Sequence, residues 1–112
     1  MKQKIASLVL VLAAGLAPLA RAAEAPRTAN SLPRVHIENF QFRPRTLEVP
    51  VGTTVVWVND DEEIHALFAL DQSFHSPGLE GDATFEHRFT APGTYEYGCS
   101  LHPQMKGTIV VR

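Results

Sequence analysis

The side chains best suited to bind a metal lie close together near the C-terminal end of the chain, in the stretch "CSLHPQMKG". Cys99 is the only cysteine among the 112 residues, and His102 and Met105 follow it at intervals of three. This spacing allows a short loop, here bounded by Pro103 and Gly107, to turn all three side chains toward one point. A thiolate, an imidazole and a thioether that converge in this way form a soft, mixed-donor metal site.

A fourth donor must come from elsewhere, and four other histidines are candidates. His65 follows a β-branched segment and an acidic loop, at the kind of strand end where a sandwich presents its loops, so its position favours it over His75 in a glycine-rich connection. His36 lies beside a polar leader, and His87 stands between two phenylalanines, where a buried, hydrogen-bonded histidine is the ordinary interpretation. Two imidazoles, a thiolate and a weak axial thioether are the ligand set of blue-copper electron-transfer centres.

The alternative for Cys99 is a buried free thiol that packs as a small hydrophobe. A single cysteine cannot form an internal disulfide, and an unpaired thiol outside the cytoplasm is open to oxidation. Coordination removes that hazard, and a metal also helps to stabilise a domain whose core is small. The metal-ligand role is therefore favoured.

The N-terminal residues predict export. Lys2 and Lys4 precede an apolar run of 13 residues at positions 5–17, and a small-residue stretch ending at Ala22 fits a cleavage site. A membrane-spanning helix needs about 20 apolar residues, so an uncleaved anchor is the weaker alternative. We expect a signal peptide at 1–22, a flexible leader at 23–34 and one domain at 35–112, located in the periplasm with no membrane span after cleavage.

The charge of the mature chain excludes some partners. Cleavage would remove three of the ten basic residues and no acidic one, so the net charge would change from −2 to −5. Nucleic acids and anionic membrane surfaces select basic patches, so neither is expected as a partner.

Apolar residues from Val35 onward alternate with a period of two, as in β-strands. The segments that we expect to be extended are 35–44, 47–49, 53–58, 66–70, 85–89, 94–99 and 108–111. Turn signals separate them, and a single helical turn within 73–79 is the one helical element considered. About seven to eight short strands of this kind predict an all-β fold, an antiparallel Greek-key β-sandwich.

Two stretches, "LEVPVGTTVVWVNDDEEIHAL" and "FTAPGTYEYGCSLHPQMKGTIVV", resemble the small cupredoxins, the type 1 blue copper proteins of the amicyanin and plastocyanin kind. The resemblance covers nearly all of the chain after the leader and implies a cupredoxin-like sandwich with one type 1 copper ion. It implies that His65, Cys99, His102 and Met105 are the ligands. It also implies that Asn59 ties the two ligand loops together by hydrogen bonds.

Three positions depart from the family pattern. Ile64 and Ala66 flank His65 where relatives have proline and asparagine, and Gly98 precedes Cys99 where a larger residue is common. Ile64 restores a backbone N–H that proline lacks, and we expect this N–H to lie near the thiolate and to tune the reduction potential.

The sequence thus predicts an exported, monomeric copper protein that carries single electrons between transient redox partners, with His102 on an exposed loop as the route for the electron. Enzymatic activity is not expected. One alternative is a periplasmic protein for copper uptake, storage or delivery, and another is a metal-free interaction domain. The acidic loop Asp60–Glu63 is either a solvated loop or a device that steers partners.

Overall fold

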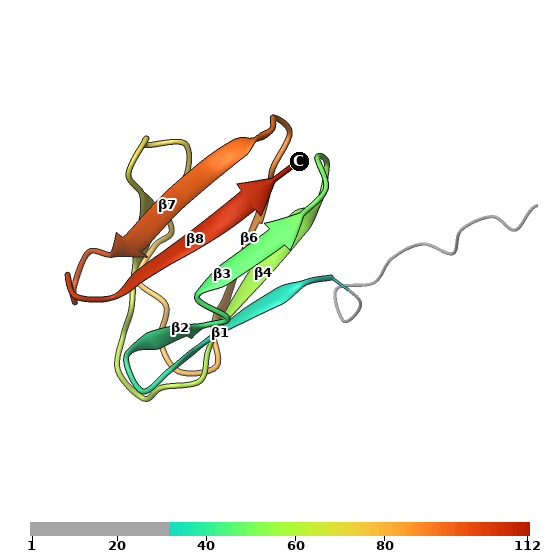
Figure 1. Cartoon of the computed structure of the whole chain (residues 1–112). Coiled ribbons are helices and arrows are strands. Elements are labelled where there is room, and N and C mark those ends of the chain that lie inside the picture. The colour runs from blue at the N-terminus through green and yellow to red at the C-terminus, as the bar shows by residue number, and fades with distance from the viewer. Residues whose placement is uncertain (1–31) are drawn as a thin grey trace, which may run out of the picture.

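The computed structural model describes residues 32–112, which form two β-sheets packed face to face (Figure 1). The strands are β1 (Arg34–Glu38), β2 (Gln41–Arg43), β3 (Thr46–Val49), β4 (Thr54–Asn59), β5 (Leu67–Ala69), β6 (Thr84–Arg88), β7 (Gly93–Cys99) and β8 (Lys106–Val111). One sheet has the order β2-β1-β4-β6 and the other β3-β8-β7-β5. The expected all-β sandwich of seven to eight strands is confirmed. Within the described residues no helix is long and apolar enough to cross a membrane.

Strand direction differs in part from the antiparallel arrangement that the sequence suggested. β1 pairs with β4 in parallel, and β3 pairs with β8 in parallel, whereas the four other pairings are antiparallel. Side chains alternate with a period of two in strands of either direction. The sequence pattern therefore predicts that a strand forms but not which way its neighbour runs.

The first predicted strand, residues 35–44, is in fact a hairpin. β1 and β2 pair antiparallel, with Glu38 opposite Gln41, so only Asn39 and Phe40 form the turn. Both turn residues have a positive φ, 55° for Asn39 and 59° for Phe40. The periodicity predicted the apolar positions but missed this turn, because phenylalanine is not a residue that ordinarily marks one.

The domain boundary and the connection after β5 also differ in detail. β1 begins at Arg34, one residue before the expected start of the domain. Residues 73–79 contain no helical turn; instead His75 forms an isolated bridge with Phe68. The predicted signal peptide (1–22) and most of the leader (23–34) lie outside the described residues, so both remain predictions.

The core fills the space between the sheets and is centred on aromatic rings. Trp57 of β4 is fully buried, and its ring lies 5.4 Å from that of Tyr97 on β7, which joins the two layers. Tyr97 also covers Gly107 on the neighbouring strand, where a Cβ atom would come within 2.5 Å of the tyrosine ring. Packing of this kind fixes β7 against β8, the two strands whose ends carry the Cys99 loop.

Candidate metal centre

Three of the predicted ligands meet at one end of the sandwich. His65, Cys99 and His102 each offer one donor atom, and these atoms all lie within 4.8 Å of one another. The Cys99 Sγ atom is 3.7 Å from Nδ1 of His65 and 3.7 Å from Nδ1 of His102. The sequence predicted this grouping, although His65 and Cys99 are 34 positions apart.

Backbone pairing to the connection after β5 holds His65 in place. Its N–H donates to the carbonyl of Leu79 at 3.1 Å, and the N–H of Leu79 donates back to the carbonyl of His65 at 2.7 Å. The side chain of His65 is fully buried. The connection after β5 has no regular sequence pattern, yet it fixes His65 through two reciprocal backbone hydrogen bonds.

Cys99 ends β7 and faces the start of β5. Leu67 is its register partner, and the N–H of Ser100 donates to the carbonyl of Ala66 at 2.8 Å. This pairing places the Ala66 N–H 3.4 Å from the Cys99 Sγ atom. We expected Ile64 to supply the donor near the sulfur; the donor is Ala66, because the β5–β7 ladder brings Ala66 next to Cys99.

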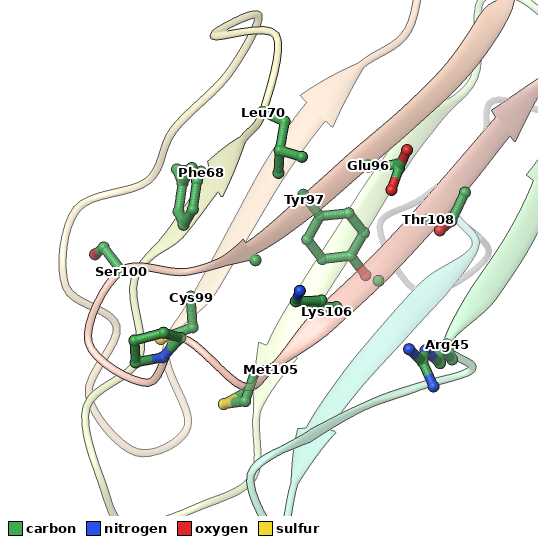
Figure 2. A pocket seen from close by; sticks show the side chains of 13 residues that line it. Arg45, Phe68, Leu70, Glu96, Tyr97, Cys99, Ser100, Met105, Lys106 and Thr108 are labelled. Carbon is green, nitrogen blue, oxygen red and sulfur yellow. The ribbon is translucent and has the colours of Figure 1, made fainter.

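The short loop after Cys99 carries the other two predicted ligands. A tight turn closes this loop, with the N–H of Met105 donating to the carbonyl of His102 at 3.0 Å. Met105 is almost fully buried at 2% exposure, whereas His102 is only half-buried. In Figure 2 the Cys99 and Met105 side chains both lie near this end of β7 and β8. His102 is therefore the predicted ligand that reaches the surface.

Asp61 contacts the site, a role that its place in the acidic loop does not distinguish from those of its acidic neighbours. Its Oδ2 atom lies 2.9 Å from Nε2 of His65, and its side chain is 11% exposed. Partial burial raises the pKa of the Asp61 carboxyl, but hydrogen bonds from the N–H groups of Phe40 and Asn39 and from His65 lower it more, so its pKa lies below the usual 3.8. The carboxylate is ionised at neutral pH and accepts a hydrogen bond from Nε2, which leaves the Nδ1 lone pair of His65 free to face the thiol. Asp61 lies four residues before His65, and this spacing is the sequence feature that could have indicated the contact.

Asn59 binds neighbouring segments together, but not the two that the resemblance implied. Its Nδ2 donates to the carbonyls of Glu63 and Leu79, each at 2.8 Å, and its Oδ1 accepts from the N–H of Asp61 at 2.8 Å. These bonds join the His65 loop to the connection after β5. Ala66 instead links the His65 loop to the Cys99 loop, because its carbonyl accepts from the N–H of Ser100 and its own N–H donates to the Cys99 sulfur.

Replacing Asn59 with alanine should destabilise the metal-free protein by about 3 kcal/mol, because it removes three hydrogen bonds to backbone groups, each worth about 0.5–1.5 kcal/mol. Urea unfolding at neutral pH measures the change. Gln41→Ala, at an exposed strand position, is the control and should leave the midpoint nearly unchanged. Equal midpoints for Asn59→Ala and the native chain would show that Asn59 does not hold these loops.

The other histidines lie outside the cluster. His75, the rival for the fourth position, is exposed on the connection, and His36 pairs with Asp60 at 2.8 Å. His87 packs between Phe74 and Phe89, with ring centroids 4.8 and 4.7 Å away, and burial lowers its pKa. His87 thus packs against aromatic rings, but it is half-buried rather than buried as the sequence suggested.

A hollow of about 630 Å³ lies beside the Cys99 loop, on the outer face of β5, β7 and β8. Figure 2 shows Phe68 and Leu70 on one side of it and Arg45 on the other. Gly98 lies on its floor, where a Cβ atom would come 3.0 Å from the carbonyl oxygen of Met105 and 3.5 Å from the Phe68 ring. The glycine that departs from the family pattern is therefore buried beneath the Phe68 ring, where a larger side chain would meet that ring and the Met105 carbonyl.

The donor set and its spacing fit a type 1 copper ion. Nitrogen and sulfur ligands that lie about 2.0 and 2.3 Å from one ion are separated by roughly 3.5–3.7 Å at tetrahedral to trigonal angles, and both Sγ–Nδ1 distances are 3.7 Å. Two imidazoles and a thiolate with a buried methionine nearby are the donors that select copper of this type.

Comparisons with known proteins agree with this geometry. The model of the cupredoxin-like domain family matches residues 6–111. Amicyanin-alpha of Methylorubrum extorquens is 32% identical over 82 residues, which are 69% of each chain. Amicyanin of Paracoccus denitrificans is 30% identical over 69% of this chain and 63% of that protein.

Solved structures show the same fold. The Cu(I) form of an amicyanin mutant in which one methionine is replaced by alanine superposes with a TM-score of 0.71 at 28% identity, and the match covers 76% of this chain and 86% of that one. A purple cupredoxin from Nitrosopumilus maritimus gives a TM-score of 0.68 at 36% identity, covering 71% of this chain and 99% of that one. With its sandwich, its donor set and these matches, the chain belongs to the cupredoxin-like family.

Proposed function

We propose that this protein is a single-electron carrier in which His65, Cys99, His102 and Met105 would hold one type 1 copper ion. The observation that carries the proposal is the convergence of three donor atoms within 4.8 Å beside a buried methionine. The likeness to the two amicyanins also supports the electron-carrier role.

Copper, when bound, supplies the one-electron couple between Cu(I) and Cu(II). The chain supplies a fixed and dry environment: His65 and Cys99 are buried, and Asp61 sets the tautomer of His65. The Ala66 N–H donates to the sulfur and withdraws charge from it, which favours the reduced state. His102 is the half-buried ligand, so its ring edge is the route by which an electron leaves.

The proposed partners are redox proteins that bind transiently through a small interface. Three exposed apolar side chains lie at or next to the ligands: Phe40 at 37%, Ile64 at 45% and Leu101 at 54% exposure. They give the face around His102 an apolar character suited to brief docking. We propose a monomer without enzymatic activity that binds neither nucleic acid nor an anionic membrane, and whose export to the periplasm depends on residues 1–22.

Repeated redox cycling in the presence of a Cu(I) chelator tests the carrier against a copper-delivery protein. The copper-loaded protein is reduced with ascorbate, held with bathocuproine disulfonate, and reoxidised with ferricyanide. A carrier should recover its visible band in full over many cycles, because the four ligands hold copper in both oxidation states. Stepwise loss of the band as the chelator takes the copper would overturn the carrier role and favour copper delivery.

A further inference from the structure

The turn between β1 and β2 holds an aromatic residue in a conformation that suits glycine. Asn39 and Phe40 are the two central residues of the hairpin, with φ values of 55° and 59°. Two-residue hairpin turns of this kind require positive φ at both positions and favour asparagine followed by glycine. A bulky residue with positive φ is an outlier, and such outliers persist where surrounding contacts hold them, often at functional sites.

The carboxylate of Asp61 holds this turn. Its Oδ1 accepts a hydrogen bond from the N–H of Asn39 at 2.7 Å, and its Oδ2 accepts one from the N–H of Phe40 at 3.0 Å. The same Oδ2 accepts a hydrogen bond from Nε2 of His65 at 2.9 Å. One carboxylate therefore fixes the turn and a ligand imidazole relative to each other.

The phenyl ring of Phe40 lies against both ligand imidazoles. Its centroid is 5.4 Å from the His65 ring at 80° and 4.9 Å from the His102 ring at 78°, both edge-to-face. The two imidazoles are themselves 4.9 Å apart at 59°. Edge-to-face packing is a favourable and directional arrangement of rings. A change in the plane of either imidazole would break a contact with the same phenyl ring.

We propose that Phe40, set by Asp61, is a positioning residue that fixes the ring planes of His65 and His102 and so preorganises the copper site. The inference rests on the proposed copper function and adds to it a residue from the first hairpin, outside the ligand loops. The strained turn is explained by this role, because the left-handed conformation held by Asp61 is the one that places the ring on both ligands.

The Phe40→Gly variant distinguishes a role of Phe40 in positioning the two imidazoles from a role in folding. Glycine adopts positive φ without strain, so this variant should fold with an unchanged or higher thermal midpoint while it loses the ring. Phe40→Tyr keeps the ring edge and is the matched control. Each is studied first without metal, by the NMR line widths of ¹⁵N-labelled histidine side chains, and then by Cu(II) titration and by EPR of the Cu(II) form.

We expect Phe40→Gly to keep the intense visible band but to bind Cu(II) about tenfold more weakly, in the range that loss of an outer partner of a metal site costs. Its His65 and His102 ring signals should broaden in the metal-free protein, and its EPR lines should broaden as the ligand planes vary. Phe40→Tyr should match the native protein in all three measurements.

Unchanged affinity, EPR lines and ring signals in Phe40→Gly would overturn the positioning role while leaving the copper site intact. A native protein that gives no visible band with Cu(II) would instead overturn the proposed function itself. Should Phe40→Gly fail to fold, Phe40→Leu, which retains apolar volume without an aromatic edge, decides the question by the same measurements.

Discussion

Replacing Cys99 with serine should abolish the intense visible band of the Cu(II)-loaded protein. The band requires charge transfer from a thiolate sulfur to copper, and a serine hydroxyl is neither a soft donor nor ionised at neutral pH. Cys99 lies at the end of β7 and is the only cysteine of the chain, so no other thiolate can take its place. Absorption spectroscopy of the titrated variant measures the loss, which should be essentially complete.

Ser100→Ala is the matched control for Cys99→Ser. Ser100 is the exposed neighbour, and its hydrogen bond to Ala66 uses the backbone N–H, which alanine keeps. The control should therefore show the full band. A native protein that remains colourless with Cu(II), or a Cys99→Ser variant that retains the band, would show that the thiolate–copper assignment is wrong.

Replacing His65 with glycine should remove the type 1 spectrum, whereas replacing His75 with alanine should leave it intact. His65 contributes a buried Nδ1 atom 3.7 Å from the sulfur, and its loss opens a space lined by Asp61 and Phe40. Copper affinity should fall by more than the roughly 10- to 100-fold that loss of an outer partner costs. His75 is exposed and lies outside the donor cluster found among residues 32–112.

Added imidazole provides a further check on the His65 variant. The small ring can enter the space left by the side chain, accept the orientation that Asp61 imposes, and restore part of the spectrum. A titration of imidazole followed by visible absorption measures this recovery. A native spectrum for His65→Gly, together with its loss in His75→Ala, would mean that the other histidine closes the site.

Contacts between residues distant in sequence were harder to predict than local ones. Asp61 was placed in an acidic loop that is either solvated or steers partners, yet its carboxylate is mostly buried against the first hairpin and His65. Phe40 was predicted only as an apolar strand position, and its ring lies on two ligands. Both roles involve a turn in which Phe40 has a positive φ, a conformation that phenylalanine does not favour.

The sequence by itself predicted a donor set and determined the class of fold. Cys99, His102 and Met105 are three residues apart on one loop, so chain connectivity alone keeps them within reach of one point. His65 could be favoured because a β-branched segment and a polar loop place it at a strand end. The period of two predicted the sandwich, because alternation requires one face of each strand to be buried.

Only the tertiary structure decided how those donors are oriented. The β5–β7 register puts the Ala66 N–H, rather than that of Ile64, at the sulfur. The parallel pairing of β1 with β4 carries the first hairpin to the loop after β4, where Asp61 meets Asn39 and Phe40. The physical reason is that alternation is the same for either strand direction and any even shift of register, so which distant residues meet is settled only when the two sheets pack together.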